Sequence, residues 1–305
     1  MGRKTALMDS TEDTITTPSK LKSYMVFTKF RLSALVVVSA LSGYLFVGEF
    51  NWLDLTYLLV GGLLVTAASN GSNQIWEREL DKKMKRTAQR PLPQGHMGLN
   101  EAYYVVTVCL IAGTALLYML NLESALLGLA AYVSYVFMYT PLKRKTAWAV
   151  LVGAFPGAIP PMMGVVAHDE IGFGMIAGVL FFVQFTWQFP HFWAIAWVAY
   201  DDYKAGGFSL LPSNSGRSKN SAFQIVVYSL ALIPFSLLPW LLEFTGTWSM
   251  VVATLIGAVF FLYSYRLYLT CEVKDARKLM FASFFYLPII QFVYVFDRIV
   301  PIEVL

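Results

Sequence analysis

Long apolar runs alternate with short polar stretches along nearly the whole chain. Nine of these runs approach or reach the length that crosses a bilayer, roughly 17–25 residues. They cover residues 33–48, 53–75, 101–120, 122–140, 147–167, 172–199, 221–242, 248–268 and 279–300. The pattern predicts an all-α membrane protein with nine transmembrane helices.

Two polar loops between these runs, at about residues 76–100 and 200–220, have the same layout. Each follows an even-numbered run, begins with carboxylates and contains a Leu-Pro pair, within "RPLP" and "SLLP" respectively. Parallel repeats are a known membrane architecture, with sites at the repeat interface. The layout therefore predicts two four-helix repeats in the same orientation plus a ninth helix.

Positive charge marks one side of the predicted bundle. All but one of the 23 Lys and Arg residues lie in the N-terminal segment or beside the second, fourth, sixth and eighth runs, and Arg298 is the exception. Because cytoplasmic loops retain Lys and Arg, the N-terminus is predicted inside and the C-terminus outside. We expect a multi-pass protein of a bacterial inner (plasma) membrane.

Composition agrees with a lipid environment and excludes several classes. The chain is 57% hydrophobic and 14% charged, with a mean hydropathy of +0.57. The net charge of +4 reflects membrane orientation, and the sequence shows no basic face of the kind that binds nucleic acid.

The domain organisation is simple. Residues 1–24 are predicted as a disordered cytoplasmic tail and residues 25–305 as a single domain. Cys109 and Cys271 fall at different membrane depths, so no disulfide is expected.

The stretch "NQIWERELDKKMKRTAQRPLP", residues 73–93, carries the first candidate site. Asn73, Glu77 and Asp81 are four residues apart, so on a helix they form one stripe that drifts about 40° per step. Asn70 joins the stripe, since seven residues return a helix to within about 20° of the same direction. The stripe follows directly on an apolar run.

Carboxylates near lipid are costly unless positive groups stand opposite them. An all-oxygen set suits Mg²⁺, which binds through one or two carboxylates and completes its shell with phosphate and water. Arg86 and Arg90 follow at once, and a guanidinium holds phosphate oxygens in a bidentate fork. The stretch therefore predicts a magnesium and diphosphate site. The alternative is a solvated helix end with ion pairs such as Glu79–Lys83.

The second candidate site lies in "WQFPHFWAIAWVAYDDYKAGGFSLLP", residues 187–212. On one continuous helix, a single stripe would contain Gln184, Gln188, His191, Ile195, Val198 and Asp202. Asp201 would lie about 80° away from it. His191 has three interpretations: a hydrogen bond between helices, a ligand to the metal of a tetrapyrrole, or a proton-transfer group.

Three further basic residues lie near the ends of these runs. Lys143 and Arg144 belong to "YTPLKRKT", and Lys204 follows the second acidic pair. Membrane orientation explains them first, and contact with a diphosphate is the second interpretation. "GAFPGAIPPMMG", residues 153–164, predicts an irregular helix that leaves room for a bulky ligand.

Together these motifs resemble the UbiA-type intramembrane prenyltransferases, and more narrowly their heme-farnesylating branch. The resemblance covers about residues 25–300. It implies helices around a central cavity open to the cytoplasmic side. It also implies that Asn73, Glu77, Asp81 and Asp202 bind Mg²⁺ with the diphosphate. Asp201, Asp202 and His191 join the catalytic set by the same resemblance, and Asn70, Arg86, Arg90, Lys143, Arg144 and Lys204 are substrate-binding candidates.

The resemblance implies transfer of farnesyl from farnesyl diphosphate to a vinyl group of heme b. Arg86 and Arg90 would stabilise the departing diphosphate, and Tyr135, Tyr139 and Trp187 are candidates to face the allylic cation. Other expected partners are the bilayer and the downstream heme hydroxylase or terminal oxidase assembly. The alternatives are prenylation of a quinone-precursor ring and a membrane heme chaperone or transporter.

Overall fold

The structure is a computed structural model that describes residues 19–48, 50–213 and 215–299. Within these ranges the regular elements are helical, and one isolated β-bridge joins Thr245 and Arg298. The helices are α1 (Lys20–Phe27), α2 (Phe30–Val47), α3 (Trp52–Asp81), α4 (Leu99–Tyr118), α5 (Leu122–Val133), the π-helix η1 (Ser134–Tyr139), α6 (Thr140–Leu142), α7 (Ala149–Val166), α8 (Met175–Val198), α9 (Tyr200–Ala205), α10 (Lys219–Leu241), α11 (Thr247–Thr270) and α12 (Val273–Phe296).

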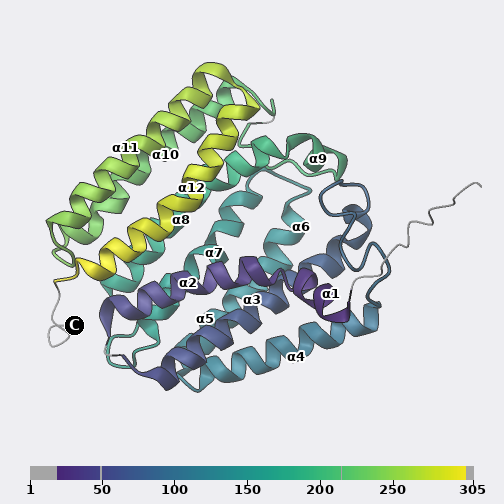
Figure 1. Cartoon of the computed structure of the whole chain (residues 1–305), viewed down its shortest axis with the longest axis horizontal. Coiled ribbons are helices and arrows are strands. Elements are labelled where there is room, and N and C mark those ends of the chain that lie inside the picture. The colour runs from purple at the N-terminus through teal and green to yellow at the C-terminus, as the bar shows by residue number, and fades with distance from the viewer. Residues whose placement is uncertain (1–18, 49, 214, 300–305) are drawn as a thin grey trace, which may run out of the picture.

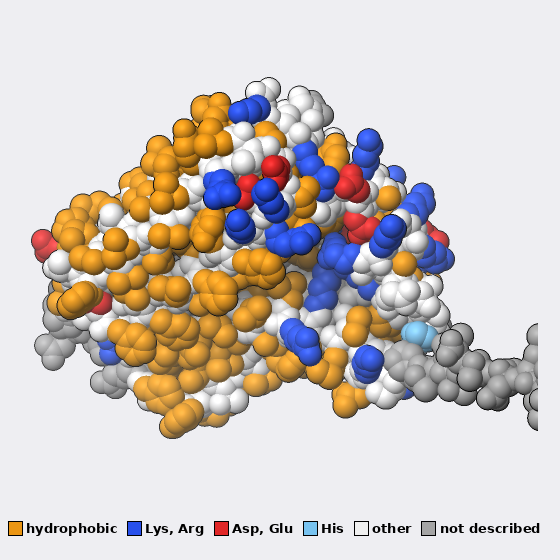
Figure 2. All heavy atoms as spheres, turned by 45° about the horizontal axis from the view of Figure 1, so that its top comes forward, with side chains coloured by type: hydrophobic (Ala, Val, Ile, Leu, Met, Phe, Trp, Pro, Cys, Tyr) orange, Lys and Arg blue, Asp and Glu red, His pale blue; other side chains and the backbone are white. Residues whose placement is uncertain are grey.

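Among the described residues, eight helices are long and apolar enough to span a membrane. They are α2, α3, α4, the run from α5 to α6, α7, α10, α11 and α12. Large apolar side chains are exposed along them, and Figure 2 shows these covering most of the visible side of the bundle. Lipid accepts such a surface and water does not, so the predicted multi-span membrane protein is confirmed.

Helix α8 is the remaining long helix, and it packs against α7, α10 and α12 (Figure 1). It carries Gln184, Gln188 and His191 as well as several Trp side chains, and it is not one of the eight candidate spans. The ninth span and the two repeats therefore stay predictions.

Several predicted boundaries differ from the observed ones. Helix α3 continues to Asp81, beyond the predicted end at residue 75, and α12 begins at Val273 rather than 279. Helix α1 includes residues 20–24, which were predicted to be tail, whereas residues 1–18 lie outside the described residues. Hydropathy finds only the apolar part of a helix, while backbone hydrogen bonding continues through charged turns.

The two polar loops meet at one end of the bundle, beside α9 (Figure 1). A Cβ atom on Gly206 would lie 2.7 Å from the Met84 sulfur, so a larger residue here would require the flexible Met84 side chain to move. Gly207 has a φ of +76°, which favours glycine. Lys and Arg side chains gather over this end in Figure 2, interspersed with acidic ones.

Candidate active site

The stripe predicted on the first motif exists, and it forms the buried end of α3. Asn73, Glu77 and Asp81 are all buried, and each contacts a residue from a segment that follows α3. The Asn73 amide donates to the Thr140 hydroxyl at 3.3 Å, and Glu77 forms an ion pair with Lys143. The stripe is therefore a contact surface for other segments, which excludes the alternative of a solvated helix end.

Asp81 and Arg90 form the most enclosed ion pair of the site. The Asp81 side chain is fully buried, and Nη1 of Arg90 donates to its two oxygens at 2.9 and 2.8 Å. The hydroxyl of Thr87 donates to the Asp81 backbone carbonyl at 3.0 Å. The loop after α3 thus folds back, and Arg90 meets the carboxylate nine residues before it.

Lys143 stands opposite Glu77 at the end of α6. Its ammonium lies 4.8 Å from the centre of the Tyr139 ring and 5.5 Å from that of Phe208. Burial lowers the pKa of Lys143, and the Glu77 carboxylate opposes this effect. Two aromatic faces and one carboxylate therefore hold a dehydrated ammonium in the site.

Asp202 connects the second acidic pair to the first loop. Its two carboxylate oxygens accept the backbone N–H groups of Lys85 at 2.7 Å and Arg86 at 3.3 Å. The Arg86 guanidinium lies over the neighbouring Tyr203 ring, 5.4 Å from its centre, and donates to the Tyr203 hydroxyl at 3.4 Å. Asp202 therefore orients the loop that carries Arg86 and Arg90.

Asp201 points elsewhere. Its side chain is 80% exposed and pairs with Arg217 at 3.0 Å. The predicted continuous stripe to Asp202 is wrong, because α8 ends at Val198 and Ala199 departs from helical geometry before α9 begins. The structure thus brings Asp202 to the first motif and leaves Asp201 on the outer side.

The other basic candidates lie at the rim. Arg144 and Lys204 are exposed. Arg144 lines a cavity of about 400 Å³ together with Glu77, Thr140 and Gly207. The cavity lies between the end of α3, α6 and the loop after α9, so it opens beside the Glu77–Lys143 pair.

His191 and Asn70 lie deeper than the ion pairs. The Nδ1 atom of His191 lies 2.7 Å from the Ser283 hydroxyl of α12, and the Trp187 ring stacks on the imidazole at 4.2 Å. Asn70 donates to the Ser33 hydroxyl of α2 at 3.2 Å. His191 lies about 10 Å of helical rise before the end of α8 at Val198, so the histidine defines a separate level of the site.

Lys29 is a basic residue that sequence reasoning placed only among the orientation charges. It adopts a left-handed conformation, with φ 48°, between α1 and α2. Burial lowers its pKa to about 7, with further lowering by Arg90, Lys143 and Arg86 and an opposing effect of Glu77. The charges of the cluster therefore act on Lys29, although nothing in its sequence context separates it from the other N-terminal cations.

The donor set fits Mg²⁺. The Asn73 amide oxygen and the Glu77, Asp81 and Asp202 carboxylates are hard oxygen ligands, which Mg²⁺ prefers over nitrogen and sulfur. No cluster of three or more His, Cys, Asp and Glu side chains close enough to hold a metal by itself occurs in the described ranges. Arg90 and Lys143 instead pair with Asp81 and Glu77, and Asp202 accepts backbone N–H groups.

The fold is shared with solved intramembrane proteins. A UbiA homologue from Aeropyrum pernix superposes with a TM-score of 0.71 at 16% identity, covering 88% of this chain and 98% of that one. A UbiA homologue from Archaeoglobus fulgidus, bound to GPP and Mg²⁺, gives a TM-score of 0.63 at 14% identity, covering 90% and 99%. The shared fold defines the class of this protein as a helical membrane bundle with an acidic and basic end.

The chain belongs to the UbiA prenyltransferase family, whose sequence profile matches residues 36–287. A protoheme IX farnesyltransferase from Cytophaga hutchinsonii is 46% identical over 284 residues, covering 92% of this chain and 99% of that protein. One from Flavobacterium psychrophilum is 43% identical over 290 residues, covering 92% and 95%. The predicted resemblance is thereby confirmed.

Proposed function

We propose that this protein transfers the farnesyl group of farnesyl diphosphate to a vinyl group of heme b. The observation that carries the proposal is the buried pairing of Asp81 with Arg90 and of Glu77 with Lys143 at one end of an apolar bundle. Relatives 37–46% identical to this chain are named protoheme IX farnesyltransferase, which supports heme as the acceptor. The apolar bundle suits an isoprenoid chain, and the charged end suits its diphosphate.

The ion pairs hold both partners ready for a diphosphate. Without substrate, Arg90 and Lys143 neutralise the carboxylates that the interior would otherwise disfavour. A bound diphosphate gives the two cations a second anionic partner, and Arg86 approaches from the loop that Asp202 orients. These three cations stabilise the charge that develops as the allylic C–O bond breaks.

Glu77, Asp81, Asn73 and Asp202 would hold Mg²⁺ together with the diphosphate oxygens. The ion supplies further positive charge to the leaving group. Of the second acidic pair, Asp202 is the ligand candidate, because Asp201 is engaged by Arg217 at the surface. Chelation of the metal should therefore abolish turnover, and Asp81→Asn should raise the Mg²⁺ concentration needed for half-maximal rate.

The aromatic side chains near the pairs provide a water-poor surface for the allylic cation. The rings of Tyr135 and Tyr139 lie 5.2 Å apart, and both residues belong to the π-helix η1 that precedes α6. Their faces can stabilise positive charge. Trp187 stacks on His191 at a deeper level, so its contribution is to the acceptor side of the site.

The membrane arrangement is part of the proposal. We place the N-terminus in the cytoplasm of a bacterial cell, α8 as the ninth span, and two four-helix repeats plus α12 around the substrate cavity. The cluster of basic side chains at the end that carries the ion pairs supports this orientation. The product would pass to the downstream heme hydroxylase or to oxidase assembly.

The test uses the full-length protein in liposomes with farnesyl diphosphate, Mg²⁺ and heme b. Mass spectrometry should find heme b increased in mass by a hydroxyfarnesyl addition, dependent on all three components. Prenylation of hydroxybenzoate or a naphthoate, with heme unchanged, would contradict heme as the acceptor. Heme transfer with no dependence on the prenyl diphosphate would instead indicate a chaperone.

A further inference from the structure

The hydrogen bonds around Ser283 determine which nitrogen of His191 carries the proton. The Ser283 hydroxyl lies 2.6 Å from the Met280 backbone carbonyl, which can only accept a hydrogen bond. The hydroxyl has one proton, and this contact uses it. Nδ1 of His191, 2.7 Å from the same oxygen, must therefore be the donor. The neutral imidazole then carries its proton on Nδ1 and a free electron pair on Nε2.

Aromatic contacts hold the orientation of this imidazole. Trp187 stacks on one face with an interplanar angle of 19°, and Phe284 meets the ring edge-on at 5.2 Å between centroids. The Trp187 indole N–H donates to the Ser283 backbone carbonyl at 3.1 Å, so Ser283 fixes both rings. Among the described residues, hydrogen bonding to His191 is made through Nδ1, and Nε2 lies across the ring from α12.

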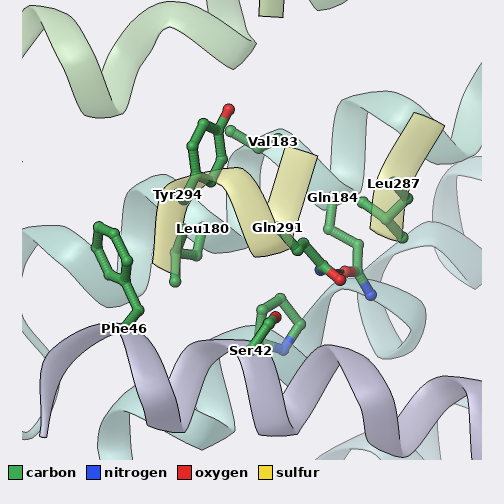
Figure 3. A pocket seen from close by; sticks show the side chains of 9 residues that line it. Ser42, Phe46, Leu180, Val183, Gln184, Leu287, Gln291 and Tyr294 are labelled. Atoms are coloured by element: carbon green, nitrogen blue, oxygen red, sulfur yellow. Dashed lines mark hydrogen bonds between the residues drawn. The ribbon is translucent and has the colours of Figure 1, made fainter. Parts of the chain in front are cut away.

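The amides of the same polar stripe have a different role. Gln184 donates to the Gly157 carbonyl at 2.6 Å and accepts from Gln291 at 2.7 Å, and Gln188 donates to the Ala154 carbonyl at 2.8 Å. Figure 3 shows Gln184 and Gln291 against each other in the wall of a small cavity near Ser42. These amides join α7, α8 and α12, whereas His191 keeps a nitrogen available.

The other two histidines of the chain do not have this arrangement. Nε2 of His168 contacts the Tyr44 backbone carbonyl at 3.2 Å, beyond the end of α7. His96 lies in the loop before α4. A neutral histidine whose Nδ1–H is hydrogen-bonded and whose Nε2 is free has the preferred form of a metal ligand. Histidine is also a common axial ligand of heme iron.

We propose that Nε2 of His191 binds the iron of the heme substrate as an axial ligand, and that Ser283 positions it. This inference rests on the proposed function. Ligation at this level would hold the porphyrin on the deep side of the diphosphate.

The direct test measures absorption and resonance Raman spectra of the purified protein with ferric and ferrous heme b. The wild type should show histidine ligation. His191→Gly should lose it, and added imidazole should restore it, while His168→Ala and His96→Ala should match the wild type. Spectra of His191→Gly identical to those of the wild type, or no response to imidazole, would overturn the inference.

Two further measurements do not depend on the folding of that variant. The wild type should bind iron-free protoporphyrin IX at least about 10-fold more weakly than heme, and equal affinities would contradict ligation. Ser283→Ala should weaken heme binding by about 10- to 100-fold and shift the frequency of the iron–histidine vibration. Ser283→Thr keeps the hydroxyl and should retain the wild-type affinity and frequency. Prenylated heme from the wild type without histidine ligation would refute this inference alone, whereas no prenylated heme at all would refute the proposed function.

Discussion

The carboxylate of Asp202 accepts the backbone N–H of Lys85 at 2.7 Å, joining segments 117 residues apart in the chain. This contact links the two polar loops that the sequence shows only as similar. It also differs from the contact of its neighbour Asp201, which pairs with Arg217 at the exposed surface. Adjacent carboxylates therefore have separate roles.

Asp202→Ala should lower kcat/KM for farnesyl diphosphate by roughly 10- to 100-fold, because hydrogen bonds to charged groups contribute about 1.5–3 kcal/mol. The loss of the loop contact should misplace Arg86 and Arg90. Asp201→Ala is the matched control and should change the rate less than about fivefold, as expected for an exposed pair. Equal losses in the two variants would contradict the different roles.

Arg90→Ala should destabilise the protein by about 3–5 kcal/mol, because Asp81 is then left as an unpaired buried charge. Thermal unfolding in detergent measures this loss. The double variant Arg90→Ala with Asp81→Asn should recover much of the stability but not the turnover. Lys82→Ala, which removes an exposed partner of Glu79, should leave the unfolding temperature nearly unchanged.

The lowered pKa of Lys29 predicts that substrate binding depends on pH. Its pKa of about 7 means that the free protein loses this positive charge as the pH rises through 7. A bound diphosphate should raise the pKa of Lys29 again, so binding should take up a proton. The affinity should therefore fall as the pH rises from 6 to 8, through the pKa of the free protein. Calorimetry in buffers of different ionisation enthalpy measures the uptake. Lys29→Arg should bind without this proton uptake, and unchanged uptake would assign it to another group.

The packing of α2 on α7 requires a residue without a side chain at position 43. A Cβ atom on Gly43 would lie 2.0 Å from the Pro161 backbone oxygen, whereas one on Gly178 meets nothing within 4 Å. Gly43→Ala should therefore cost about 1–3 kcal/mol through overpacking. Thermal unfolding should show Gly178→Ala at or above the wild-type stability, since alanine favours the helix.

The apolar runs and the oxygen-rich stripe on α3 were determined by local sequence. A membrane helix must satisfy its own backbone, so its length and polarity are visible in about 20 residues. The spacing of Asn73, Glu77 and Asp81 likewise defines one helix face, since all three lie on a continuous helix. The membrane class, the family and the first motif could therefore be inferred before the fold was known.

Only the tertiary structure decided which groups meet that face. Lys143 pairs with Glu77 across 66 positions, and the charges of the cluster act on Lys29, which lies between α1 and α2. Asp201 and Asp202 look equivalent in sequence, and the break at Ala199 turns only one of them inward. The proton of His191 is set by Ser283, 92 residues away. Such pairings depend on how helices pack in three dimensions, which the period of a single helix does not encode.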